Sequence, residues 1–198
     1  MAPDPDAALM VAFQGGDASA FRTLFEKYAP AMVSFCHRFV RDHARAEELA
    51  QDVFLKLHAA ARRYEPSARF KTYLYRIAAN HCLNEVRRGK HQPVREQPHP
   101  DAPGAADPDA HAGSLPTPEE VSQGAALGRA VEVFLERLPA NQRAALVLCR
   151  FEGLSYEEIA AVLDTSVSAV KSLIHRATVA ATAALAPFSP AEGKQALR

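Results

Sequence analysis

Small hydroxyls, cations and an imidazole recur at helical spacing within residues 154–177, which read LSYEEIAAVLDTSVSAVKSLIHRA. Ser155 followed three residues later by Glu158 is a capping box that begins a helix, and residues 164–166 form a turn into a second helix. Small hydroxyls beside cations fit a major groove and its phosphates. The pattern predicts a helix-turn-helix that binds duplex DNA, although an ordinary helical hairpin with a solvated face has the same spacing. The predicted contact residues are Ser155, Ser166, Ser168, Lys171, Ser172, His175 and Arg176.

A second set of basic and amide side chains lies earlier in the chain. Nine Lys and Arg residues fall within 62–95 against two acids, so this segment can face phosphate. Several of its polar residues repeat at steps of three and four and share one helical face. They are Arg76, Asn80, Asn84, Arg87 and Arg88. Tyr73 or Tyr75 could stack on an unpaired base, which is worth ~1–3 kcal/mol per base. For each tyrosine, packing in the core is an equally good interpretation.

An acidic, amide-bearing surface is expected on the helix over residues 44–61. Its polar positions are Glu47, Glu48, Gln51 and Asp52, beside an apolar stripe of Leu49, Val53, Phe54 and Leu57. Such a face can bind a basic coiled coil through a hydrophobic centre and a polar rim. Taken alone it would be a solvated surface, and its presence beside the two motifs above favours docking.

The elements that position these motifs are two small helical domains. Ala, Leu, Arg and Glu are abundant while Trp and runs of strand-forming residues are absent, so the expected fold class is all-α. Residues 7–90 and 118–186 read as helical, and 187–198 as a short polar tail. Residues 91–117 are rich in Pro and Asp and predict a flexible, acidic linker. The expected helices span about 20–40, 44–61, 67–88, 117–137, 141–151, 155–163 and 167–186.

Other functional classes find no support in the sequence. Cys36, Cys82 and Cys149 are far apart in apolar stretches, so neither a disulfide framework nor a metal site is expected. The adjacent pairs formed with His37 and His81 point about 100° apart on a helix, and no phosphate-cradling Gly loop exists. No enzymatic activity and no cofactor are therefore expected. The acidic start is unlike a signal peptide and no apolar run approaches ~18 residues, which predicts a cytoplasmic, nucleoid-associated protein without membrane insertion.

The C-terminal motif resembles region 4 of the extracytoplasmic-function (ECF, group 4) sigma factors of the sigma-70 family. The resemblance rests on Leu138-Pro139, Gln142-Arg143, Leu146-Val147-Leu148, residues 151–160, Val162-Leu163, Ser166, Ser168 and Val170-Lys171-Ser172. In that family this helix-turn-helix binds the −35 promoter element as duplex. Asp164 stands where Gly is common, and Ala169 and Leu173 stand where Thr and Arg are frequent. The family's −35 sequence preference is therefore not transferred to this chain.

The N-terminal part is similar to region 2 of the same family. The matching residues are Gly16-Asp17, Ala20-Phe21, Leu24-Phe25, Tyr28, Ala46-Glu47-Glu48-Leu49, residues 51–57, residues 70–80, Asn84 and Arg87-Arg88. The resemblance implies docking on the polymerase β′ clamp helices through Glu47, Glu48, Gln51, Asp52 and Phe54. It also implies that residues 62–88 melt and read the −10 element, and that the loop before the third helix captures a flipped −10 base. The implied −10 residues are Arg62, Arg63, Lys71, Tyr73, Arg76, Asn80, Asn84, Arg87 and Arg88.

Together the two resemblances imply a sigma factor that binds core RNA polymerase, at the β′ clamp helices and the β flap, and directs promoter-specific initiation. They imply an anti-sigma factor as a further partner. They also imply that the linker runs toward the active-site channel, although a passive tether has the same composition. The alternative is a helix-turn-helix regulator that binds duplex DNA without polymerase. It explains residues 154–177 but neither the Arg/Asn face nor the acidic helix.

Overall fold

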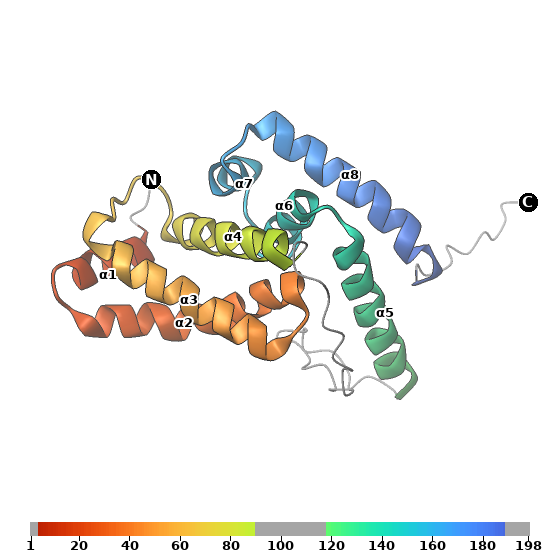
Figure 1. The fold of residues 1–198 in the computed structure, drawn as a ribbon, viewed down its shortest axis with the longest axis horizontal. Coiled ribbons are helices and arrows are strands. Elements are labelled where there is room, and N and C mark those ends of the chain that lie inside the picture. Colours follow the sequence, from red (N-terminus) through yellow and green to blue (C-terminus); the bar gives the residue numbers. More distant parts are fainter. Residues whose placement is uncertain (1–3, 90–117, 189–198) are drawn as a thin grey trace, which may run out of the picture.

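A computed structural model describes residues 4–89 and 118–188, which form helices joined by short turns (Figure 1). The helices are α1 (Pro5–Gln14), α2 (Ala18–Val40), α3 (His43–Ala60), α4 (Phe70–Gly89), α5 (Pro118–Arg137), α6 (Ala140–Arg150), α7 (Tyr156–Leu163) and α8 (Val167–Leu185), with 3-10 turns η1 (Ala61–Arg63) and η2 (Ala186–Phe188). The described residues are all-helical, which confirms the predicted fold class, and none of these helices is long and apolar enough to cross a membrane. The predicted linker, 91–117, and most of the predicted tail lie outside the described residues.

Helices α1 to α4 pack around one apolar core. Asp17 and Asp42 cap α2 and α3, because their carboxylates accept from the amides of Ser19 and Arg45 at 2.9 Å each. The apolar stripes of the helices then meet in a core from which water is excluded. This core includes Leu24, Met32, Phe35, Leu49, Val53, Leu57, Phe70 and Leu74. The close packing holds α3 against α4, so the acidic face and the Arg/Asn face belong to one rigid unit.

Helices α5 to α8 form a second unit that contains the predicted helix-turn-helix. The hydroxyl of Ser155 accepts from the amide of Glu158 at 3.2 Å, and the Glu158 carboxylate accepts from the amide of Ser155 at 2.8 Å. Asp164, at φ 49°, takes the left-handed conformation that turns the chain from α7 into α8. Ser166 then caps α8 by accepting from the amide of Ala169 at 3.1 Å. The capping box and the turn over residues 164–166 are as the sequence predicts, and Asp tolerates the left-handed conformation that the turn requires.

Two features of the N-terminal unit depart from the sequence expectations. Residues Pro5–Gln14 form α1, a helix that precedes the first expected one and packs on α2. In addition, α4 begins at Phe70 rather than near Ser67. The reason is that the Phe70 amide donates to the carboxylate of Asp4 at 2.7 Å, so the cap comes from the start of the chain. A cap supplied from so far away leaves no local signal in the sequence.

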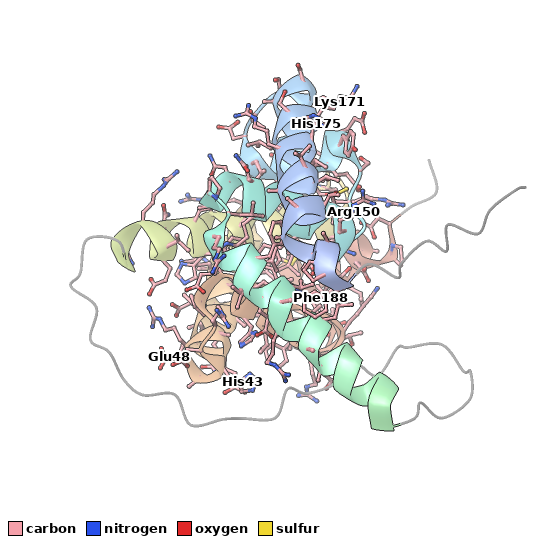
Figure 2. All side chains as sticks on the ribbon, turned by 90° about the vertical axis from the view of Figure 1, so that its right-hand side faces the viewer. His43, Glu48, Arg150, Lys171, His175 and Phe188 are labelled. Atoms are coloured by element: carbon pink, nitrogen blue, oxygen red, sulfur yellow. The ribbon has the colours of Figure 1, made fainter. Side chains whose placement is uncertain are left out.

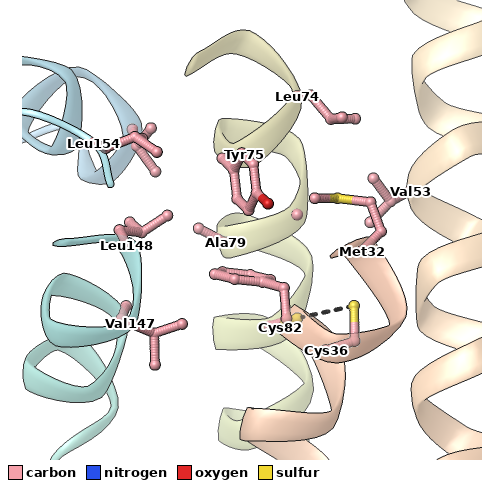
Figure 3. Packing of buried hydrophobic residues seen from close by; sticks show 14 of the residues in the cluster. Met32, Cys36, Val53, Leu74, Tyr75, Ala79, Cys82, Val147, Leu148 and Leu154 are labelled. Carbon is pink, nitrogen blue, oxygen red and sulfur yellow. Dashed lines mark hydrogen bonds between the residues drawn. The ribbon is translucent and has the colours of Figure 1, made fainter. Parts of the chain in front are cut away.

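The two units pack against each other along α4. Helices α6 and α7 lie against α4, and α2 contacts α5 (Figure 1). Figure 3 shows Tyr75 and Ala79 of α4 facing Val147 and Leu148 of α6 and the buried Leu154. The apolar core is therefore continuous from one unit into the other.

Candidate nucleic-acid interface

The side chains predicted to contact duplex DNA lie on the outward face of α8, in the turn before it and at the N-cap of α7. All are exposed: Ser155, Ser166, Ser168, Lys171, Ser172, His175 and Arg176. Figure 2 shows Lys171 and His175 at the outer end of α8, far from the acidic Glu48 of α3. Ser155 and Ser166 act as acceptors in helix caps, so each keeps its O–H for donation to a phosphate. The role of this face in DNA binding stays a prediction.

One exposed face of α4 carries the cations and amides that the sequence places together. Arg76, Asn80, Asn84, Arg87 and Arg88 are all exposed. In the 3-10 turn before α4, Arg62 and Arg63 are exposed as well. The geometry is that of a basic, amide-bearing surface which can follow a nucleic-acid backbone and present donors and acceptors to bases.

The two tyrosines of α4 have different environments. Tyr73 is half-buried, with its ring packed edge-on against Tyr64 at 5.1 Å between centroids and the Arg76 guanidinium 5.3 Å from its ring centre. Tyr75 is fully buried and donates its hydroxyl to the Glu152 carboxylate. Burial and this neighbouring carboxylate raise the pKa of Tyr75. In this arrangement Tyr75 is a core residue, whereas Tyr73 keeps part of its ring at the surface.

Acceptors from the C-terminal unit cover the beginning of α4. Lys71 Nζ donates to the carbonyl of Glu152 at 2.6 Å, and Thr72 Oγ1 donates to the Glu158 carboxylate at 3.2 Å. A guanidinium nitrogen of Arg69 lies 3.7 Å from the same carboxylate. The contact encloses a cavity of about 50 Å³, enough for a few water molecules. Its lining is Glu65, Ser67, Ala68, Thr72, Tyr73, Arg76 and Ala161. Glu152 and Glu158 were not predicted as partners of α4, because both are distant from it along the chain.

The acidic face of α3 is largely accessible. Glu47, Glu48 and Gln51 are exposed, and Asp52 is half-buried. Asp52 Oδ2 lies 3.1 Å from Nε2 of His81 in α4, and the ammonium of Lys56 contacts the other ring nitrogen. Burial and the Lys56 ammonium lower the pKa of His81, so the ring is neutral near pH 7 and links Lys56 to Asp52. The contact with His81 therefore holds the Asp52 side chain in place at the inner edge of the acidic face.

The apolar residue at the surface of α3 is not the one that the periodicity selected. Phe54 is only 5% exposed and packs against Phe25, with 4.8 Å between ring centroids. Leu55 is 67% exposed. It follows Gln51 and Asp52 by four and three residues, so the helical spacing of the acids themselves points to Leu55. Phe54 therefore packs in the core beneath the acidic face of α3.

An apolar cavity of about 220 Å³ opens between α5, α6 and α8. Its lining is Val131, Phe134, Leu135, Leu146, Arg150, Phe151, Thr178, Ala181 and Leu185. Phe151 is 46% exposed, and the guanidinium of Arg38 lies 4.2 Å from its ring centre. The cavity was not predicted, because its walls come from three helices whose crossing is a tertiary feature.

Family comparisons match both units to parts of one family. Residues 24–92 match Sigma-70 region 2, and residues 128–179 match Sigma-70, region 4. The RNA polymerase sigma-H factor of Pseudomonas aeruginosa is 35% identical over 186 residues, which cover 93% of this chain and 96% of that relative. The ECF RNA polymerase sigma-E factor of Escherichia coli is 32% identical over 173 residues, which cover 87% of this chain and 90% of that relative.

Two solved structures are also similar to this chain. The sigma factor RpoE of Bartonella quintana, crystallised with the anti-sigma factor NepR, is 26% identical with a TM-score of 0.61, over 84% of this chain and 96% of that chain. CnrH, solved in complex with the cytosolic domain of CnrY, shares the fold at 24% identity with a TM-score of 0.69, over 94% of this chain and 100% of that chain.

Proposed function

This chain belongs to the ECF class of the sigma-70 family of RNA polymerase sigma factors, and we propose how its surfaces divide the work of initiation. As a sigma factor it binds core RNA polymerase and directs transcription from specific promoters. The observation that carries the residue-level proposal is the combination, on one chain, of three exposed surfaces: the acidic face of α3, the Arg/Asn face of α4 and the polar face of α8. Residues 7–90 act as region 2 and residues 118–186 as region 4.

Helix α4 and the turn before it bind the melted −10 strand. The cations Arg62, Arg63, Arg87 and Arg88 neutralise phosphates, which supplies affinity without sequence preference. Asn80 and Asn84 offer amides to the edges of unpaired bases. The stack of Arg76 on Tyr73 lies at the wall of the small cavity beside the loop, where an extruded base meets an aromatic platform.

Helix α8 binds the −35 duplex. Lys171 and Arg176 reach phosphates or guanine, and the hydroxyls of Ser166 and Ser168 lie near the helix N-terminus, where a recognition helix enters the major groove. His175 is exposed on the same helix.

Core polymerase is held at two places. Glu47, Glu48, Gln51 and Asp52 bind the basic side chains of the β′ clamp helices, while Leu55 supplies the apolar centre of the contact. The apolar cavity between α5, α6 and α8 receives the β flap, because a groove with this lining suits the apolar face of a helix. Two separate contacts on one linked chain give a multivalent grip.

The packed arrangement of the two units must open before promoter binding. The −35 and −10 elements lie roughly 25 base pairs apart, or about 85 Å of duplex at about 3.4 Å per base pair. A compact chain of this length has a radius of gyration of roughly 16 Å, which is far too small to span that distance. The contacts of Glu152 and Glu158 with α4 are therefore the ones that break when polymerase and promoter bind.

An anti-sigma factor holds this chain inactive, as a partner of the kind that accompanies the Bartonella quintana relative in its crystal. The chain works in the cytoplasm at the nucleoid, and it contributes no catalytic group of its own to transcription.

Reconstitution with core polymerase, followed by run-off transcription on a genomic promoter library, tests the proposal. A shared −35 and −10 sequence among the transcribed promoters is the expected result. A chain that binds duplex sites tightly without polymerase and produces no transcripts would instead be a helix-turn-helix regulator. Substitution of Asn80 and Asn84 by Ala is expected to erase selectivity at −10 positions and leave selectivity at −35 positions intact.

A further inference from the structure

Helix α1 contacts both ends of the loop that precedes α4. At its C-terminal end, Gln14 Nε2 donates to the carbonyls of Arg62 and Tyr64, at 3.2 Å each. At its N-terminal end, the carboxylate of Asp4 accepts from the Phe70 amide at 2.7 Å. The loop between these points, residues 65–69, is exposed throughout. One helix thus holds the two places where this loop joins the folded unit.

The carboxylate of Asp4 caps two helices at once. Its Oδ1 accepts from the amide of Asp6 at 3.0 Å, which begins α1, and its Oδ2 accepts from the amide of Phe70, which begins α4. A negative charge at a helix N-terminus is favoured by both the unpaired amides and the helix dipole. Asp4 therefore fixes the start of α4 relative to α1.

Helix α1 is itself firmly anchored, so it can act as a support. Met10 is fully buried, and Asp6 is buried under α2. The Asp6 carboxylate accepts from Lys27 Nζ at 2.6 and 2.7 Å and from the Tyr28 hydroxyl at 2.5 Å. Charge-assisted hydrogen bonds of this kind are short and strong. The position of Gln14 and Asp4 is consequently set by α2 and not by the loop.

Within the N-terminal unit, the loop's own backbone adds one hydrogen bond, from the Ser67 amide to the Glu65 carbonyl at 2.8 Å, whereas Arg69 contacts Glu158 of the C-terminal unit. Tyr64 is its buried anchor at 3% exposure, yet its hydroxyl has no hydrogen-bond partner within the described residues. Its ring touches Tyr73 and Phe70 without directional polar contacts, at 5.1 and 6.3 Å between centroids. The hydrogen bond from the Gln14 amide to the Tyr64 carbonyl therefore fixes the direction of the chain where the loop leaves the 3-10 turn.

We propose that Gln14 and Asp4 are positioning residues for −10 recognition, which hold the loop in the conformation that receives an extruded base. The inference rests on the proposed −10 role of this loop and deepens it. A base enters a loop more readily when the loop is already ordered, because the binding step then costs less conformational entropy. Glu65, Ser67 and Ala68 of this loop line the cavity beside Tyr73 and Arg76.

The test uses the full chain as holoenzyme on a promoter that the wild-type holoenzyme transcribes. Gln14→Leu removes both donors from an exposed helical position, whereas Gln14→Lys keeps a donor in place. Ala12→Lys, two residues away on α1 and exposed, controls for added charge. The first readout is the −10 ratio, which is transcription from this promoter divided by transcription from versions with single −10 substitutions. The −35 ratio is defined in the same way for −35 substitutions. The third readout is the affinity for core polymerase.

The expected result for Gln14→Leu is a roughly three- to tenfold loss of the −10 ratio, in line with the usual worth of one or two hydrogen bonds. The −35 ratio and core affinity stay at wild-type values, and Gln14→Lys restores the −10 ratio. Asp4→Asn, with one acceptor oxygen in place of two, gives an intermediate loss. An unchanged −10 ratio, or a loss shared equally by all three readouts, overturns the inference. Failure of the wild-type holoenzyme to select any promoter overturns the proposed function instead.

Discussion

Tyr75 of α4 donates its hydroxyl to the carboxylate of Glu152, and this partly buried hydrogen bond joins the two helical units. The hydrogen bonds from Lys71 to the Glu152 carbonyl and from Thr72 to the Glu158 carboxylate add to it, and together they hold the beginning of α4 against the C-terminal unit. The same chain therefore has a closed state in which its two promoter-binding units contact each other. Its stability sets how readily the chain engages polymerase and DNA.

Removing the donors of this contact is expected to favour the open state. Tyr75→Phe with Thr72→Val deletes two hydroxyls at nearly constant volume, which weakens the contact by about 3–6 kcal/mol, since both bonds end on carboxylates. Small-angle scattering of the free chain should show a larger radius of gyration, and holoenzyme should form faster. Tyr156→Phe, a half-buried tyrosine of α7, is the control. Scattering curves that superimpose for all three proteins would show that these bonds do not hold the units together.

Local signals in the sequence located most helices because caps and apolar periodicity act within a few residues. Asp17, Asp42 and Ser155 each cap the helix that immediately follows. Asp4 caps α4 from the start of the chain, so the sequence placed that helix start near Ser67 instead of Phe70. Tertiary contacts therefore set helix boundaries that local caps and apolar periodicity do not predict.

The exposed site residues were more predictable than the buried ones. Arg76, Asn80, Asn84, Arg87 and Arg88 share a face of α4 because of helical geometry alone, and all five are exposed, whereas Lys71 is half-buried. Tyr75 could not be separated from Tyr73 in the sequence, since its burial depends on α6 and Leu154 packing over it. The burial of Phe54, which the resemblance implied as a docking residue, was missed for a similar reason, because packing against Phe25 depends on where α2 lies.

Lys171→Ala with Arg176→Ala is expected to weaken promoter binding by the holoenzyme. Each cation that contacts a phosphate adds about 0.9 to the slope of log affinity against log salt concentration. The double variant should therefore lower that slope by about 2 if both side chains contact phosphate. Arg22→Ala, an exposed cation of α2, should leave the slope unchanged. A wild-type slope in the double variant would exclude phosphate contacts by this pair.

Glu48→Lys with Asp52→Lys is expected to weaken core polymerase binding by tenfold or more. Charge reversal places cations against the basic partner expected at α3, and like-charge contacts at an interface cost several kcal/mol. Leu55→Ala should cause a smaller loss through reduced apolar contact. Fluorescence anisotropy of labelled chain with core enzyme measures both effects, with Glu26→Lys, an exposed acid of α2, as the control. Intact holoenzyme assembly by the double variant would remove α3 from the docking surface.

Acid is expected to destabilise the N-terminal unit through His81. Burial and Lys56 lower the pKa of His81 in the folded chain, whereas the unfolded chain keeps the ordinary value near 6.5. Between the folded value and 6.5 the unfolded state binds more protons, so the free energy of unfolding falls as the pH drops. The contribution is fully present above about pH 6.5 and is lost as the pH falls through the folded pKa.

The groups that face His81 explain why its pKa is lowered, and substitution of His81 tests the prediction. Lys56 and Asp52 of α3 contact its ring, and Glu85 of α4 lies nearby. Protonation would turn the ring nitrogen that accepts from Lys56 into a second donor, so that contact becomes repulsive, and this repulsion together with burial outweighs the stronger attraction of the charged ring to Asp52. Urea midpoints at pH 7.5 and 5.5 should differ less for His81→Gln than for wild type, because Gln does not titrate. His175→Gln, on the exposed face of α8, should keep the wild-type difference. An equal difference in all three proteins would mean that His81 is not the group through which acid acts.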